Sequence, residues 1–350
     1  MRNDTLQRNW TIRPLIPDDV GPFRELYRVL HGFSRPQEYD NWFFHENIHG
    51  FPIGMVAMAD SHLVGVYMLS QVELSLGDLR LKGAQSVDTM THPDFRNQGI
   101  FVALATATMD LAAKQGIEIL YGLPNDNSYH GFVRRLGWTH TGNLRRWLRV
   151  LAPDQLFKLP RILGAGLKSV ALSLPPLALG SYDLQISSNI DQALMPFLER
   201  PSCSRQNCMV SRTQPWMHWR YAKATNMNYE WITAWRDGQC KAVASWGMRT
   251  AAWQQGENGR AKIAEIFGDS PATAALVVAH AAKRAAMRGA TMIETISTSR
   301  FTDQVMRRAW FVPHGRPPLI VKRLGESQAI PFDVYEHAGW SLRGGDSDTY

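Results

Sequence analysis

The stretch THPDFRNQGIF, residues 91–101, places an arginine and a glycine directly ahead of an apolar, helix-forming run. The first turn of a helix exposes unpaired backbone N–H groups at the positive end of the helix dipole, so Arg96-Asn97-Gln98-Gly99 predicts an anion site. Gly99 lets the backbone approach a phosphate without a Cβ in the way. Arg96 adds a fixed charge that can bind two phosphate oxygens at once.

The residues just before this turn predict an open strand edge. Pro93 cannot donate a hydrogen bond to a neighbouring strand, so pairing is expected to stop there and the sheet to open beside residues 90–92. A linear ligand that carries amides can add to such an edge like an extra strand. Phosphates joined to an amide-rich arm describe coenzyme A.

These segments resemble the GNAT acetyltransferases, whose motif V-x-P-x-x-(R/Q)-x-x-G-x-(G/A) runs from the fourth strand into the third helix. The match covers about residues 10–150, and THPDFRNQGI is close to the version found in Eis-type tandem acetyltransferases. Phe101 stands where the family has Gly or Ala. The resemblance implies that the turn binds acetyl-CoA as co-substrate, through Thr91, His92, Arg96, Asn97, Gln98, Gly99, Ile100 and Phe101.

The implied reaction is direct attack of an amine on the acetyl thioester in a ternary complex. By family position, the donor to the carbonyl oxygen is a backbone N–H near Met90 or Thr91. Asp88 is the expected base, because it is a carboxylate in an otherwise uncharged strand and burial would raise its pKa. Glu73 and His92 are the alternatives, and a chain of waters could replace a dedicated base.

The expected acid is Tyr129. The family places a tyrosine four residues before the glycine of an LGF segment, where it protonates the leaving sulfur. Here that segment is LGW at residues 136–138, and Val133 occupies the family position. Tyr129 lies one turn earlier on about the same helix face, although it could equally be a packing residue. Asn127 is expected to contact the pantetheine arm, unless the NDNS turn is only a helix cap.

The second half of the chain repeats landmarks of the first. Trp42 and Asp60 are as far apart in the sequence as Trp219 and Asp237. The segments VRRLGW and MRRAWF follow these landmarks in the same order, which indicates duplication. We therefore expect an α+β chain of two tandem GNAT-like domains, each with a central, mostly antiparallel twisted sheet flanked by helices.

The expected boundaries follow from this repeat and from composition. They are 1–150 for the acetyl-CoA-binding domain, 151–184 for an apolar linker, 185–325 for a degenerate second domain and 326–350 for a C-terminal tail. The second copy lacks the Arg-x-x-Gly turn, so it is expected to keep the fold and to have lost the ligand.

Composition excludes several other classes of protein. With 45% apolar and 20% charged residues, no signal-like N-terminus and no run of 18 apolar residues, the 350-residue chain is expected to be cytoplasmic without an integral membrane span. Its three cysteines lack CxxC spacing and predict neither a disulfide framework nor a zinc knuckle. The net charge of +7 has no aromatic-interleaved pattern, so no nucleic-acid partner is expected.

Two other functions stay open. HENIH at residues 45–49 matches the H-E-x-x-H string of zinc hydrolases, but Gly50 and Pro52 end any helix there, so no metal site is expected. A non-catalytic acyl-CoA-binding or scaffold protein would keep the turn without turnover. The expected acceptor is an amine of a small molecule or peptide, while peripheral membrane contact and a homo-oligomer stay open.

Overall fold

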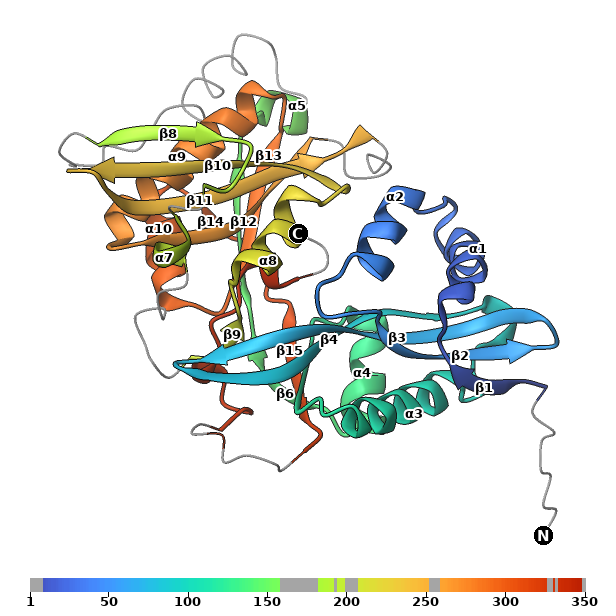
Figure 1. The fold of residues 1–350 in the computed structure, drawn as a ribbon. Coiled ribbons are helices and arrows are strands. Elements are labelled where there is room, and N and C mark those ends of the chain that lie inside the picture. The colour runs from blue at the N-terminus through green and yellow to red at the C-terminus, as the bar shows by residue number, and fades with distance from the viewer. Residues whose placement is uncertain are drawn as a thin grey trace. The chain divides into compact units, whose positions relative to one another are not determined.

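The computed structural model describes residues 9–157, 182–191, 194–198, 207–251, 259–325, 330 and 333–347. The chain forms two compact units (Figure 1). Unit 1 consists of Met1–Glu73, Leu81–His140 and Ile320–Ala329, and unit 2 of Leu74–Arg80, Thr141–Leu319 and Ile330–Tyr350. Most of the expected linker, 151–184, lies outside the described residues. Within the described ranges, no helix is both long and apolar enough to cross a membrane.

Unit 1 is built on one twisted sheet. In spatial order its strands are β1 (Thr11–Pro14), β2 (Ile53–Ala59), β3 (His62–Leu76), β4 (Leu79–Thr91), β5 (Ile119–Gly122), β15 (Pro318–Arg323) and β6 (Thr139–Asn143). A short eighth strand, β9 (Met209–Val210), pairs with the C-terminal end of β3. β4 and β5 run parallel, whereas the pairs β1–β2, β2–β3 and β5–β15 are antiparallel. This confirms the mostly antiparallel sheet expected from the sequence.

Helices cover both faces of this sheet (Figure 1). One face carries α1 (Val20–His31), preceded by a 3-10 turn (Pro17–Asp19), and α2 (Gln37–Asp40), which continues as the π-helix η2 (Asn41–His45). The other face carries α3 (Ile100–Lys114), preceded by the 3-10 turn Pro93–Phe95, and α4 (Asp126–Arg135). The apolar side chains of α3 and α4 form one buried cluster with those of β2, β3 and β5.

Unit 2 repeats this plan. Its strands in spatial order are β8 (Asp183–Ser187), β10 (Met227–Arg236), β11 (Gln239–Arg249), β12 (Arg260–Gly268), β13 (Met292–Ser297), β7 (Arg145–Val150) and β14 (Val312–Pro313). Its helices are α5 (Pro153–Phe157), α7 (Met195–Leu198), α8 (Gln214–Met217) with the π-helix η5 (His218–Ala222), α9 (Pro271–Met287), α10 (Arg300–Arg308), and the 3-10 helices η7 (His337–Gly339) and η8 (Gly344–Asp346). The two-domain α+β fold expected from the duplication is therefore present.

Details of backbone geometry recur in both units. The turn residues Asp60 and Asp237, which are equivalent landmarks of the repeat, have positive φ angles of 50° and 53°. The parallel strands keep the same register, because Gly83 pairs with Ile119 in unit 1 and Arg260 pairs with Met292 in unit 2. A π-helix directly follows α2 in unit 1 and α8 in unit 2.

Each sheet contains at least one strand from the other half of the chain. β15 follows the helices of unit 2 in sequence, yet it pairs with β5 through Ile320–Gly122 and Val321–Tyr121. β7 follows β6 after one residue, yet it pairs with β13 of unit 2. The boundaries expected from the sequence put β7 in the segment 1–150 and β15 in the segment 185–325, whereas their hydrogen bonds place each strand in the other sheet.

This exchange makes the core of unit 1 depend on a residue from the end of the chain. Ile320 is fully buried in the cluster formed by α3, α4 and the sheet, so Ile320→Ala is expected to lower the free energy of unfolding by about 2–4 kcal/mol. Hydrogen exchange should become faster at the amides of β5. Val312→Ala, at an edge-strand residue that is 57% exposed, is the control with little effect. Faster exchange confined to unit 2 would contradict the strand assignment.

Candidate functional site

The start of α3 forms the expected anion-binding turn. Gly99 is the N-cap in the left-handed region at φ 81°, and Asn97 also has a positive φ of 62°. Helical hydrogen bonding begins with the Ala103 N–H, which donates to Gly99 O at 3.1 Å, so the preceding N–H groups have no partner within the helix. A Cβ added at Gly99 would meet nothing within 4 Å. The turn therefore has unpaired helical N–H groups next to open space at Gly99, and Arg96 and Gln98 are exposed beside it.

The sheet opens beside the end of β4. Pairing between β4 and β5 runs from Gly83–Ile119 to Ser86–Gly122, whereas β4 continues to Thr91. His92 N–H donates to Val64 O of β3 at 2.8 Å. Since successive N–H groups of a strand point to opposite edges, the Thr91 N–H points to the edge away from β3. Of the two predicted oxyanion donors, Thr91 therefore has the better-placed amide, and Met90, which is buried, points its N–H towards β3.

Asp88 is held in an unusual backbone conformation on β4. Its φ is 42°, a region that costs about 1–3 kcal/mol for a residue other than glycine. Its Oδ2 accepts a hydrogen bond from Arg35 Nη1 at 2.6 Å, and its side chain is 22% exposed. The structure thus gives this carboxylate a cationic partner, whereas the sequence predicted a buried carboxylate among uncharged residues.

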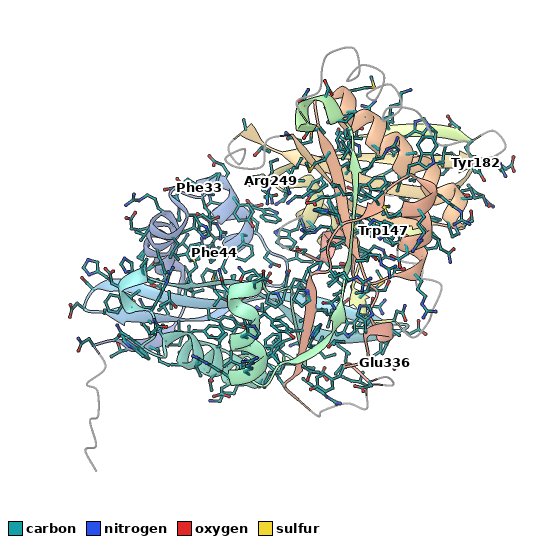
Figure 2. The ribbon with its side chains drawn as sticks, turned by 180° about the vertical axis from the view of Figure 1, so that it is seen from behind. Phe33, Phe44, Trp147, Tyr182, Arg249 and Glu336 are labelled. Atoms are coloured by element: carbon teal, nitrogen blue, oxygen red, sulfur yellow. The ribbon has the colours of Figure 1, made fainter. Side chains whose placement is uncertain are left out.

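Arg35 belongs to the candidate site, although no sequence pattern indicated it. Its side chain is 2% exposed and also contacts Asp40 Oδ1 through Nε at 2.9 Å. Burial lowers the pKa of Arg35, but the neighbouring negative charges of Asp88 and Asp40 outweigh it and raise the pKa above its ordinary value. Five aromatic rings lie with their centroids 4.5–5.8 Å from its Cζ: Phe23, Tyr27, Tyr39, Phe43 and Phe44. Figure 2 shows Phe44 and Phe33 in this part of unit 1.

Phe101, the departure from the family motif, packs away from the turn. Its ring meets Phe132 of α4 edge-on, with centroids 5.3 Å apart and an interplanar angle of 85°. A Cβ added at Gly131 would lie 2.6 Å from Phe101 Cε1, so the ring fits against the backbone of α4 only because residue 131 is glycine. The side chain therefore belongs to the α3–α4 contact, while its backbone N–H stays in the first turn of α3.

Tyr129 has a partner that the sequence did not reveal. Its hydroxyl lies 2.8 Å from Nδ1 of His140 on β6. Tyr129 itself is half-buried at the edge of the unit 1 core, so it combines packing with an accessible hydroxyl. Asn125 accepts hydrogen bonds from the Asn127 and Ser128 N–H groups at 3.1 Å and so caps α4, which leaves the exposed Asn127 side chain free of that role.

The remaining predicted positions have local roles. His92 Nδ1 accepts a hydrogen bond from the Asp94 N–H at 3.3 Å, so this histidine is part of the turn itself. Glu73 lies near His49: burial lowers the pKa of His49, and the charge of Glu73 opposes this effect. In HENIH the helix ends at His45, so the two histidines do not share a helix face. Among the described residues, no group of three or more His, Cys, Asp or Glu could hold a metal ion.

The contact between Phe101 and Gly131 gives a matched set of variants. Gly131→Ala is expected to cost about 1–3 kcal/mol of unfolding free energy, because the new Cβ overlaps the ring. Adding Phe101→Ala should remove the overlap, so the double variant loses less than the sum of the single losses. Gly21→Ala, where a Cβ meets nothing within 4 Å, is the control. Additive losses in a denaturation series would show that the two residues are not coupled.

Sequence comparisons place unit 1 in a known family. Residues 11–141 match the family model described as Acetyltransferase (GNAT) domain. An uncharacterised N-acetyltransferase of Methanocaldococcus jannaschii is 26% identical over 166 residues, which is 42% of this chain and 68% of that protein.

Solved structures with similar folds cover both units. A tandem GNAT protein from the clavulanic acid biosynthesis pathway is 16% identical and has a TM-score of 0.58, over 91% of this chain and 100% of the other. Eis1 from Mycobacterium abscessus is 15% identical with a TM-score of 0.54, over 90% of this chain and 73% of the other. Residues 11–141 therefore form a GNAT acetyltransferase domain, in a chain with the fold of tandem GNAT proteins.

Proposed function

We propose that the protein is an N-acetyltransferase that moves an acetyl group from acetyl-CoA to an amine by direct attack in a ternary complex. The observation that carries this proposal is the pairing of two backbone features, the donor turn at Gly99 and the open edge of β4 after Ser86. One suits phosphates and the other suits an amide-bearing arm. The match of residues 11–141 to the GNAT family model supports it.

Acetyl-CoA fits the residues that surround these features. The pyrophosphate would lie on the N–H groups of Gly99, Ile100 and Phe101, with Arg96 supplying charge and Asn97 and Gln98 lining the turn. The open space in front of Gly99 supports this placement, since a Cβ there would meet none of the described residues within 4 Å. The pantetheine arm would follow β4, with Asn127 at its other side. Bound in this way, acetyl-CoA supplies the activated acyl group.

The residues around the open edge can serve the three steps of acyl transfer. The Thr91 N–H would stabilise negative charge on the carbonyl oxygen as the acceptor nitrogen bonds to the acyl carbon. Asp88 would receive the acceptor ammonium and take its proton, while Arg35 fixes the orientation of the carboxylate. Tyr129 would give its hydroxyl proton to the sulfur as the carbon–sulfur bond breaks. His140 can then restore that proton from solvent, because it is exposed.

The acceptor is proposed to be an amine of a small molecule or a peptide. The partly exposed carboxylate of Asp88 favours a cationic acceptor. A non-catalytic acyl-CoA-binding protein is the second candidate. It is favoured by the valine that stands at residue 133, the family position of the tyrosine.

Calorimetric titration of acetyl-CoA tests the binding turn. We expect Arg96→Ala to weaken binding roughly 10- to 100-fold, because a charge-assisted hydrogen bond to phosphate contributes about 1.5–3 kcal/mol. Arg316→Ala, an exposed arginine of unit 2, should bind like the wild type. Equal affinity of all three proteins, or no binding by any, would remove the basis of the proposal.

Release of free thiol in the presence of a panel of amines tests the catalytic roles. Tyr129→Phe should lower kcat by about 100-fold or more while the affinity for acetyl-CoA stays unchanged. Asp88→Asn should lower kcat and raise the KM for the amine. A wild type that binds acetyl-CoA but transfers nothing to any amine would favour the non-catalytic candidate. Unchanged kinetics in either variant would exclude that residue from the mechanism.

A further inference from the structure

The C-terminal segment, residues 340–347, packs against the central strands of unit 2. Arg343 forms an antiparallel bridge with Ser297 at the end of β13, and the Thr298 N–H donates to Leu342 O at 3.1 Å. The helix η8 lies against both β12 and β13. Cys208 and Trp340 form a further, parallel β-bridge between their backbones. The segment therefore adds its own backbone beside β13.

This location corresponds to the open edge of unit 1. Gly83–Ile119 and Arg260–Met292 are equivalent pairs of the parallel strands. Ser297 follows Met292 at the same distance in sequence as Pro124 follows Ile119, and Pro124 lies just past the end of β5. In unit 1 no described strand pairs with the edge of β4 there, whereas in unit 2 residues 342–346 lie at the equivalent edge.

Beneath the segment lies the counterpart of the Arg35–Asp88 pair. Arg212 is separated from Arg35, and Glu265 from Asp88, by the same sequence interval that relates Asp237 to Asp60. Arg212 Nη2 contacts Glu265 Oε1 at 2.9 Å, with side chains only 1% and 0% exposed. The same ion pair is thus present in both units, but it is completely covered in unit 2.

Residues of the C-terminal segment bind directly to this cluster. Asp346 Oδ1 accepts a hydrogen bond from Arg212 Nη1 at 2.5 Å. Arg220 Nε donates to Gly345 O at 3.2 Å, and the Tyr221 hydroxyl donates to Glu265 at 2.5 Å. A Cβ added at Gly345 would overlap both the Tyr221 hydroxyl and the Glu265 carboxylate. Only a glycine fits at this point, because the backbone of the segment packs directly against the side chains of the cluster.

The first turn of α9 has fewer unpaired N–H donors than the first turn of α3. Ser270 Oγ accepts a hydrogen bond from the Thr273 N–H at 3.1 Å, and Pro271 occupies the first helical position and has no N–H. The donors that α3 offers to a phosphate are thus partly used or missing at α9.

We propose that residues 340–347 are an intrachain peptide ligand of unit 2, which occupies the edge of β12 and β13 where unit 1 would receive the pantetheine arm. The chain accordingly has one acyl-CoA site, in unit 1, and a second copy that is closed by its own C-terminal segment. The statement about acyl-CoA stoichiometry depends on the proposed function, whereas the docking of the segment does not.

Hydrogen exchange of the full-length chain tests the docking. Amides 341–347 should exchange slowly in the wild type, and Gly345→Ala should speed their exchange at least about tenfold, since its Cβ displaces the segment. Gly21→Ala is the matched control, because a Cβ added at Gly21 meets nothing within 4 Å. If Gly345→Ala does not fold, Asp346→Asn takes its place, because it removes only the charge that pairs with Arg212. Fast exchange in the wild type, or no change in the variant that is measured, overturns the proposal.

Calorimetry with acetyl-CoA provides an independent readout. One molecule bound per chain, with affinity reduced by Arg96→Ala and unchanged by Gly21→Ala, supports a single site. Two molecules per chain would overturn the proposal. If no acetyl-CoA binds, the function proposed for unit 1 fails, and the exchange experiment alone decides whether the C-terminal segment is docked.

Discussion

A buried ion pair between an arginine and a carboxylate constrains both halves of this molecule. A guanidinium without water is stable only when it is paired, so Arg35 has to keep Asp88 and Asp40 beside it, and Arg212 has to keep Glu265 and Asp346. Each pair joins an arginine just before α2 or α8 to the strand at which the sheet opens, β4 or β12. The pair therefore fixes the position of a strand edge that the hydrogen bonds of the sheet leave unpaired.

The two units differ in which segment supplies the second carboxylate to the buried arginine. In unit 1 the second carboxylate, Asp40, comes from the adjacent helix, so the pair is complete without any other segment and Asp88 stays partly exposed. In unit 2 residue 217 is methionine at the position of Asp40, and the second carboxylate comes from the C-terminal segment. The source of the second carboxylate thus differs between the two units, and so does the exposure of the ion pair.

Local sequence patterns predicted most of unit 1, because the turn at Arg96–Gly99, the helix after it and the strands before it depend on neighbouring residues. Arg35 was missed because its partner Asp88 is distant in the sequence and a lone arginine before a proline has no periodic signature. The repeat of Ser-Arg-x-Gln at residues 34–37 and 211–214 was the available signal. The packing of Phe101 could not be read either, since it depends on the absence of a side chain at Gly131. The exchanged strands have ordinary strand sequences, which do not specify a partner.

The exchange of β7 and β15 also determines how the chain would respond to a break in its backbone. A cut between Phe157 and Tyr182 leaves one fragment that contains β1 to β7 and another that contains β8 to β15. The first fragment holds β7 of the second sheet, and the second fragment holds β9 and β15 of the first. Neither fragment can complete its own sheet. We therefore expect the two fragments to stay associated after the cut, as the fragments of a split protein do.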